Sequence, residues 1–170
     1  MIEVIDNFLP EESFKSLIYH VIECRQFPWN YNGYVAGNTE EKLDRYNWYL
    51  TNVVYAIDPI QIQPEYDPID EFLISHIKMD KLLRAKANLY PGTDKIFEHA
   101  PHVDYDYPTI GAILSLNTCD GFTRLEDGTK VDSVANRMLF FDSSTPHNSS
   151  TTTNAQTRIN ININLSLIHI

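Results

Sequence analysis

The short segment "HAPHVDYDY" places a histidine and a carboxylate on one side of the chain. His102 and Asp104 are two residues apart, so on an extended backbone both side chains point the same way. A second histidine, His147, follows the apolar segment 138–141 in "NRMLFFDSSTPH". The interval between Asp104 and His147 is long enough for the chain to form strands and reverse direction, which would bring the two residues together. The three side chains are therefore candidate ligands of one metal ion.

Two imidazoles and one carboxylate on one face of an octahedron leave three coordination positions open. This is the facial triad of non-haem Fe(II) oxygenases, which need open positions for a chelating co-substrate and for O₂. An HxD pair alone occurs by chance in many chains, but Arg158 follows in "TRINININLSLIHI". Its guanidinium could form a bidentate pair with the distal carboxylate of a 2-oxo acid that chelates the metal through its other end.

The segment that carries Arg158 alternates polar and apolar residues with a period of two, which predicts a β-strand with two different faces. Its apolar residues are Ile159, Ile161, Ile163, Leu165 and Leu167, and its polar residues are Arg158, Asn160, Asn162, Asn164 and Ser166. The segment "LLRAKANLYPG" alternates in the same way, with Arg84, Lys86, Asn88 and Tyr90 on its polar face. A solvated outer face is the alternative. With the metal motif beside them, we expect both polar faces to line a cavity and both aliphatic faces to pack on a second layer.

Helices come first along the chain and strands follow. "LPEESFKSLIYHVIE" (9–23) predicts an amphipathic helix with Pro10 at its first position, and "PIDEFLISHIKMDKL" (68–82) predicts a second helix that begins at Pro68. From residue 82 onward the predicted strands are "LLRAKANLY", "TIGAILSLN", "FTRLE", "TKVDSV", "NRMLFFD" and "TRINININLSLIHI". This order favours two packed sheets or a barrel over a βαβ arrangement.

Residues 29–66, between the two predicted helices, are rich in aromatic side chains. They include Trp29, Tyr31, Tyr34, Tyr46, Trp48, Tyr49, Tyr55 and Tyr66. One interpretation is a set of strands and loops packed by these rings. The other is a lid or substrate-binding surface, because aromatic side chains also serve recognition.

Length, charge and composition restrict the class of protein. With 170 residues, 43% of them hydrophobic, the chain suits one globular domain with a real core. Its formal net charge of −10 argues against an extended nucleic-acid partner or an anionic membrane, although a local basic groove stays possible. No apolar run approaches the roughly 18 residues that span a bilayer, and the N-terminus lacks an export pattern. Cys24 and Cys119 belong to no CxxC pair, so we expect reduced cysteines in a cytoplasmic protein.

Taken together, the chain resembles the Fe(II)/2-oxoglutarate-dependent dioxygenases, and within them the prolyl 4-hydroxylase and hypoxia prolyl hydroxylase-like branch. The resemblance covers most of the chain and is carried by "NFLPEESFKSLI", "NLYPG" before "HVD", "ILSLN", "DGFTRL", "NRMLFFDSSTPH" and "TRININ". It implies a mainly β fold with flanking helices. A double-stranded β-helix (jelly-roll) core, residues 82–170, would pack against a helical and aromatic-rich support region, residues 1–81, in a single domain.

The resemblance also implies roles for individual residues. His102, Asp104 and His147 would hold Fe(II). Arg158 would pair with the distal carboxylate of 2-oxoglutarate, and the hydroxyl of Tyr90 in "YPG" would donate to the same carboxylate.

Further positions of the motif region have expected roles. Asn160 could add a hydrogen bond to the co-substrate, and Ser115 stands where some relatives place a tyrosine that faces it. The turn Asp120-Gly121-Phe122-Thr123 departs from the family's Gly-Gly-x-Thr in its first residue. His99 is a rival ligand, but only His102 is followed by a carboxylate two residues later. The histidines expected to be structural or exposed are His20, His76 and His169.

The implied activity is hydroxylation of an unactivated C–H bond by O₂, coupled to conversion of 2-oxoglutarate to succinate and CO₂. The first candidate substrate is a prolyl residue in a peptide or protein. The alternative is a free amino acid, another small metabolite or a nucleobase. Three other classes stay open: a β-helix without its metal, a zinc or manganese site for hydrolysis or isomerisation, and a non-catalytic 2-oxoglutarate-binding protein. The sequence is silent on oligomeric state.

Overall fold

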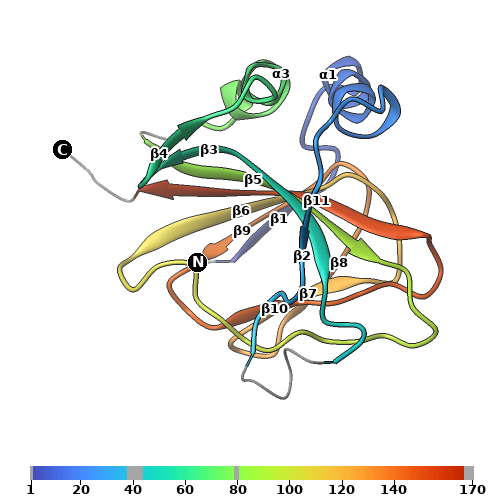
Figure 1. The fold of residues 1–170 in the computed structure, drawn as a ribbon. Helices are drawn as coiled ribbons and strands as arrows, with labels where there is room; N and C mark the ends of the chain where they lie inside the picture. The colour runs from blue at the N-terminus through green and yellow to red at the C-terminus, as the bar shows by residue number, and fades with distance from the viewer. Residues whose placement is uncertain (1, 38–43, 79–80, 167–170) are drawn as a thin grey trace.

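The computed structural model describes residues 2–37, 44–78 and 81–166. Within these ranges, two α-helices lie on one face of a large antiparallel sheet, and a small sheet lies on its other side (Figure 1). The predicted fold class, mainly β with flanking helices, is confirmed.

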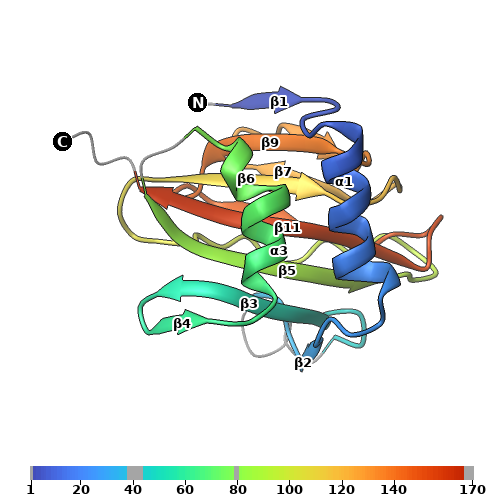
Figure 2. The same cartoon turned by 90° about the horizontal axis from the view of Figure 1, so that it is seen from above.

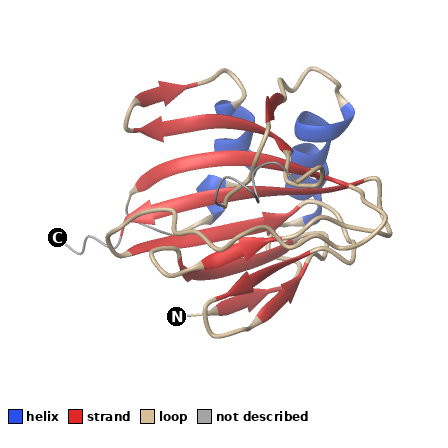
Figure 3. Ribbon diagram, turned by 60° about the horizontal axis from the view of Figure 1, so that its bottom comes forward, coloured by secondary structure: helices blue, strands red, loops and turns tan. Residues whose placement is uncertain are grey.

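The strands form two antiparallel layers. The large sheet contains β1 (Glu3–Ile5), β2 (Asn30–Asn32), β3 (Tyr49–Ile57), β4 (Ile60–Ile62), β5 (Leu82–Pro91), β6 (Thr109–Ser115), β9 (Arg137–Asp142) and β11 (Thr157–Ser166). Its order is β1-β9-β6-β11-β5-β3-β2, with β4 paired to β3. The small sheet contains β7 (Phe122–Leu125), β8 (Lys130–Asp132) and β10 (His147–Ser149), in the order β10-β7-β8. This layering agrees with a double-stranded β-helix, and Figure 3 shows the helices on one side of it only.

Both helices run across the strands and lie side by side (Figure 2). Helix α1 (Glu11–Ile18) begins one residue after Pro10 and continues as a π-helical turn, Tyr19–Glu23. Helix α3 (Tyr66–Phe72) is followed by a 3₁₀ turn, Ile74–His76. No helix of the described residues is long and apolar enough to cross a membrane.

The prediction of one helix over residues 68–82 was therefore wrong in both bounds, because α3 begins at Tyr66 and ends at Phe72. Leu73 and Ile77 are both buried in the core, but Ile77 lies on an extended backbone. The chain has to turn there to enter β5 at Leu82, and a 3.6-residue stripe does not show where such a turn begins. Met79 and Asp80, which the prediction included, lie outside the described residues.

The core between the helices and the large sheet uses the aliphatic face of β11. Its side chains Ile159, Ile161, Ile163 and Leu165 are buried together with Leu17, Val21, Ile69 and Leu73 of the helical region. Leu167 lies outside the described residues. Because the aliphatic face meets the helices, the polar face of β11 must look toward the small sheet.

Strands β1 and β10 were not predicted, and β2, β3 and β4 were expected only as unplaced strands within the aromatic segment 29–66. In β1, Val4 lies opposite Leu139 of β9, and in β10, Asn148 lies opposite Arg124 of β7. Strands of three residues are too short for a period-two pattern, so only tertiary pairing defines them. Both cysteines are free, as expected.

Candidate metal centre and co-substrate pocket

The side chains of His102, Asp104 and His147 converge, and one ligand atom from each lies within 4.8 Å of the other two. Two backbone hydrogen bonds of 3.0 Å between His102 and His147 hold the histidines side by side. The Nε2 atoms of His102 and His147 lie 4.0 and 3.8 Å from the carboxylate oxygens of Asp104. These separations are too long for hydrogen bonds and leave room for one ion between the three groups.

The protonation of the histidines suits a divalent metal ion. His147 Nδ1 lies 3.0 Å from the carbonyl oxygen of Thr145. A carbonyl only accepts, so Nδ1 carries the proton and the lone pair of Nε2 faces Asp104. Burial, followed by the neighbouring His147, lowers the pKa of His102 to about 4. His102 is thus neutral at neutral pH, as a metal ligand must be.

Asp104 is held as an oriented carboxylate. Arg84 Nη2 donates to its Oδ1 at 2.8 Å, and the amides of Asn164 and Asn162 donate to its Oδ2 at 2.9 and 3.3 Å. Burial acts to raise the pKa of Asp104, but the charge of Arg84, the neighbouring His147 and the Asn164 hydrogen bond outweigh it. The pKa falls well below its usual range. With two imidazole nitrogens and one carboxylate as donors, the set fits Fe(II).

The polar faces of strands β5 and β11 form one wall of the pocket beside these ligands. Their residues lie opposite one another in the pairs Tyr90–Arg158, Asn88–Asn160, Lys86–Asn162 and Arg84–Asn164. Opposite residues of paired strands share a face. Lys86, Asn88, Asn160 and Asn162 line the pocket together with His102 and His147. The prediction that both polar faces look inward is confirmed.

Arg158 lies at one end of this wall and is only 1% exposed. Its Nη2 donates to Thr123 Oγ1 at 2.9 Å and its Nη1 to the Ser150 carbonyl at 3.3 Å, while Nε finds no acceptor among the described residues. The guanidinium lies 5.4 Å from the ring of Tyr90, which lines the pocket with Thr123. A buried cation that is bonded only to neutral groups is costly. An anionic ligand such as a carboxylate would offset that cost.

The departure from the family turn does not touch Arg158. A Cβ at Gly121 would lie 2.6 Å from Arg158 Cδ, so glycine is needed for this close approach, and Thr123 supplies the hydroxyl acceptor. Asp120, the residue that differs, instead accepts hydrogen bonds from the Thr152 hydroxyl at 2.6 Å and the Thr153 amide at 2.8 Å. The two residues of the turn that contact Arg158 are those that match the family.

His99 lies outside the group of three ligands. It is 1% exposed, and its Nδ1 lies 2.9 Å from Ser149 Oγ, with burial lowering its pKa to about 4. His20 is half-buried and stacks on Phe72 at 5.7 Å. His76 is also half-buried, and His169 lies outside the described residues.

Ser115 and Asn160 lie opposite one another on β6 and β11. Asn160 lines the pocket, and its Oδ1 accepts a hydrogen bond from Asn88 Nδ2 at 3.0 Å. Ser115 is buried on the same face but is not among the pocket-lining residues.

The aromatic segment divides between packing and the pocket. Trp29, Tyr55 and Tyr66 pack against the helix-side core, which supports the structural interpretation. Tyr49 lines the pocket and stacks on Tyr90, with ring centroids 5.6 Å apart. The recognition interpretation therefore remains only for the part of the segment near Tyr49.

Sequence reasoning missed several residues that shape this site. Thr145 orients His147, and Arg84, Asn162 and Asn164 hold Asp104. Except for Thr145, all lie on the two alternating strands, so the polar alternation was the signal that could have found them. It predicted the faces but not which side chains meet Asp104.

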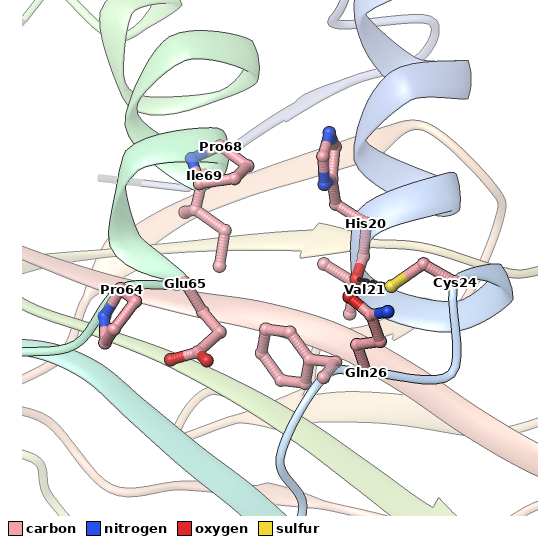
Figure 4. A pocket seen from close by; sticks show the side chains of 9 residues that line it. His20, Val21, Cys24, Gln26, Pro64, Glu65, Pro68 and Ile69 are labelled. Carbon is pink, nitrogen blue, oxygen red and sulfur yellow. Dashed lines mark hydrogen bonds between the residues drawn. The ribbon is translucent and has the colours of Figure 1, made fainter.

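A second pocket lies between α3 and the π-helical turn that continues α1, on the helix side of the large sheet (Figure 4). Val21 lies on the π-helical turn and Ile69 on α3, and His20, Cys24 and Glu65 also belong to the pocket lining. Within the described residues, the triad is the single group of side chains placed to hold a metal ion. His20, Cys24 and Glu65 do not form a second one.

Solved structures share this fold over nearly the whole chain. A prolyl hydroxylase from Trichoplax adhaerens, in complex with a peptide fragment of a hypoxia inducible factor oxygen degradation domain, matches with a TM-score of 0.67 and 18% identity, covering 96% of this chain and 82% of that chain. A prolyl-4-hydroxylase from Pseudomonas putida matches with a TM-score of 0.60 and 16% identity, covering 96% and 91%. HygX from Streptomyces hygroscopicus, with nickel and 2-oxoglutarate bound, matches with a TM-score of 0.57 and 10% identity, covering 96% and 81%.

Neither the family models nor the sequences of curated proteins match the chain. At identities this low, the structural likeness shows the fold alone. The chain therefore has the fold of prolyl 4-hydroxylases and other 2-oxoglutarate-dependent enzymes, and it carries a candidate HxD…H metal triad within that fold.

Proposed function

We propose that the protein is an Fe(II)- and 2-oxoglutarate-dependent dioxygenase that hydroxylates an unactivated C–H bond and releases succinate and CO₂. The observation that carries this proposal is the convergence of ligand atoms from His102, Asp104 and His147. A zinc or manganese hydrolase could use the same three ligands. It would not account for the buried Arg158 guanidinium near the same pocket.

Each residue of the site has a defined task in this proposal. His102 and His147 offer Nε2 to the metal, and Asp104 offers a carboxylate oxygen kept in place by Arg84. When bound, Fe(II) supplies the activation of O₂ that is coupled to oxidation of 2-oxoglutarate. The protein contributes the ligand geometry and a pocket that restricts water.

Arg158 and Tyr90 would hold the distal carboxylate of 2-oxoglutarate. The unpaired Nε of Arg158 can donate to an anion, and burial raises the pKa of Tyr90, so its hydroxyl stays protonated and can donate as well. Asn160, whose Oδ1 is already bonded to Asn88, can turn its amide N–H groups toward the co-substrate. Ser115 would have a lesser part, because it lies beside Asn160 and outside the pocket lining.

The first candidate substrate is a prolyl residue in a peptide or protein. This choice is supported by the likeness in fold to a prolyl hydroxylase in complex with a peptide. A free amino acid or another small metabolite is the alternative. The same proposal takes residues 1–170 as one dioxygenase domain, in which β3 of the support region pairs with β5 of the β-helix core.

The test is to purify the protein without oxygen, load it with Fe(II), add 2-oxoglutarate and O₂, and measure succinate. Peptide and metabolite pools are then screened for products that gain one oxygen atom, with His102→Ala as the matched control. Succinate that depends on both O₂ and an intact triad supports the proposal. Metal and 2-oxoglutarate binding without succinate from any pool would instead identify a non-catalytic 2-oxoglutarate-binding protein.

A further inference from the structure

Lys86 extends from β5 into the candidate metal pocket, where Tyr49 of β3 also lies. Its ammonium is 5.6 Å from the centroid of the Tyr49 ring. Among the described residues, it makes no ion pair and no hydrogen bond, and the Tyr49 hydroxyl makes no hydrogen bond either. Two donors thus meet in one pocket without an acceptor.

The single carboxylate of the metal centre does not satisfy Lys86. Asp104 is already bonded to Arg84, Asn164 and Asn162. Lys86 is half-buried, so its ammonium is partly shielded from water, and a bound anion would offset the free-energy cost of that shielding. Burial, and then the charge of Arg84, lower the pKa of Lys86 to about 8, and the charge of Asp104 opposes them only in part.

Lys86 also stands apart from the position expected for the distal carboxylate of 2-oxoglutarate. That carboxylate belongs at Arg158, which lies opposite Tyr90, whereas Lys86 lies opposite Asn162. Residues 86 and 90 are four apart on one extended strand, so their Cα atoms are separated by about 13 Å. An anion at Lys86 is therefore a different group from the one at Arg158.

We propose that the Lys86 ammonium and the Tyr49 hydroxyl bind a carboxylate of the primary substrate. This inference rests on the proposed function, because it assumes that Fe(II) and 2-oxoglutarate occupy the rest of the site. Burial raises the pKa of Tyr49 to about 12, which keeps its hydroxyl protonated as a donor. The carboxylate could belong to a free amino acid or other small acid, or to the C-terminus or an acidic side chain of a peptide.

The experiment is calorimetric titration of the protein loaded with Mn(II) and 2-oxoglutarate without oxygen. The probes are the standard amino acids, small mono- and dicarboxylic acids, and short proline-containing peptides, each with its amidated counterpart. We expect at least one carboxylate to bind the wild type, with its amide binding about tenfold or more weakly, as for loss of a charge-assisted pair. Lys86→Met should lose this preference for the carboxylate over its amide, and Lys86→Arg should keep part of it. Lys95 is exposed, so Lys95→Met should keep the full preference.

The two arms separate the possible sources: binding by small acids points to a free metabolite, and binding by free-C-terminal or acidic peptides alone points to a peptide. The proposal is overturned if no carboxylate binds the wild type, or if Lys86→Met binds the carboxylate as well as the wild type does. It is also overturned if Lys86→Met weakens 2-oxoglutarate itself. Failure of the proposed function gives a different result, because the Fe(II)-loaded wild type would then form no succinate.

Discussion

Arg84 and Asp104 form an ion pair beside the candidate metal centre, with Arg84 Nη2 2.8 Å from Asp104 Oδ1. The Asp104 side chain is 5% exposed and that of Arg84 is 22% exposed, so the pair is largely shielded from water. Arg84 Nε also donates to Asn164 Oδ1 at 3.0 Å, while Asn164 Nδ2 donates to Asp104. The three side chains therefore fix the direction of the carboxylate before a metal ion arrives.

Replacing Arg84 should weaken metal binding. We expect Arg84→Gln to lower the affinity for Mn(II) by roughly 10- to 100-fold, as is typical when a group that orients a ligand is lost. Calorimetric titration measures this effect, and the melting temperature shows whether the variant is folded. Arg137→Gln is the control, because Arg137 pairs with Asp6 at the surface. Unchanged affinity in Arg84→Gln would mean that the asparagines suffice to orient Asp104.

The ligands themselves should be indispensable. We expect His102→Ala, Asp104→Ala and His147→Ala each to abolish Fe(II)-dependent turnover of 2-oxoglutarate, with the fold retained by circular dichroism. The half-buried His76, which lies outside the pocket, supplies the control His76→Ala with full turnover. Wild-type turnover in any two of the three ligand variants would refute the assignment.

Arg158 should determine the requirement for 2-oxoglutarate. Arg158→Ala removes a charge-assisted pair in a buried site, worth about 2–4 kcal/mol or roughly 30- to 1,000-fold in affinity. Arg158→Lys should recover only part, because an ammonium cannot reproduce the bidentate geometry of the guanidinium. The measurement is the concentration of 2-oxoglutarate that gives half-maximal succinate formation. If Arg158→Ala needs no more co-substrate than the wild type, the carboxylate is held elsewhere.

Tyr34 tests whether the aromatic segment contacts the primary substrate. It is 50% exposed and precedes Val35, which lines the pocket. We expect Tyr34→Ala to lower product formation while 2-oxoglutarate affinity stays at the wild-type value and stability changes by only about 0.5 kcal/mol.

Tyr31→Ala is the matched control for Tyr34. Tyr31 is 70% exposed and lies opposite Leu50 of β3. Leu50 in turn lies opposite Leu89, which packs against the helix-side core. Tyr31 therefore shares the helix-side face of the sheet and points away from the pocket. Product formation should be unchanged in this variant. Loss of activity in proportion to loss of stability in Tyr34→Ala would show a structural role instead.

Local periodicity and spacing were enough to predict the two-faced strands and the side on which each face lies. In β11, Ile161 faces the helices and Asn160 faces the pocket, because consecutive side chains of a strand point to opposite sides. The HxD spacing placed His102 and Asp104 on one side for the same reason. Turn residues and the alternation of polar and apolar residues also located most of the strands after residue 82.

Only the tertiary structure decided which side chains meet. The register of β5 against β11 places Arg84 beside Asn164 and Lys86 beside Asn162, and a slip of one residue would have turned every polar side chain of β5 toward the helices. The pairing of His102 with His147 brings together residues from distant parts of the chain. Sequence periodicity fixes only the direction of a side chain within its own strand. The distance between side chains on different strands is set by pairing register and packing, which no local pattern records.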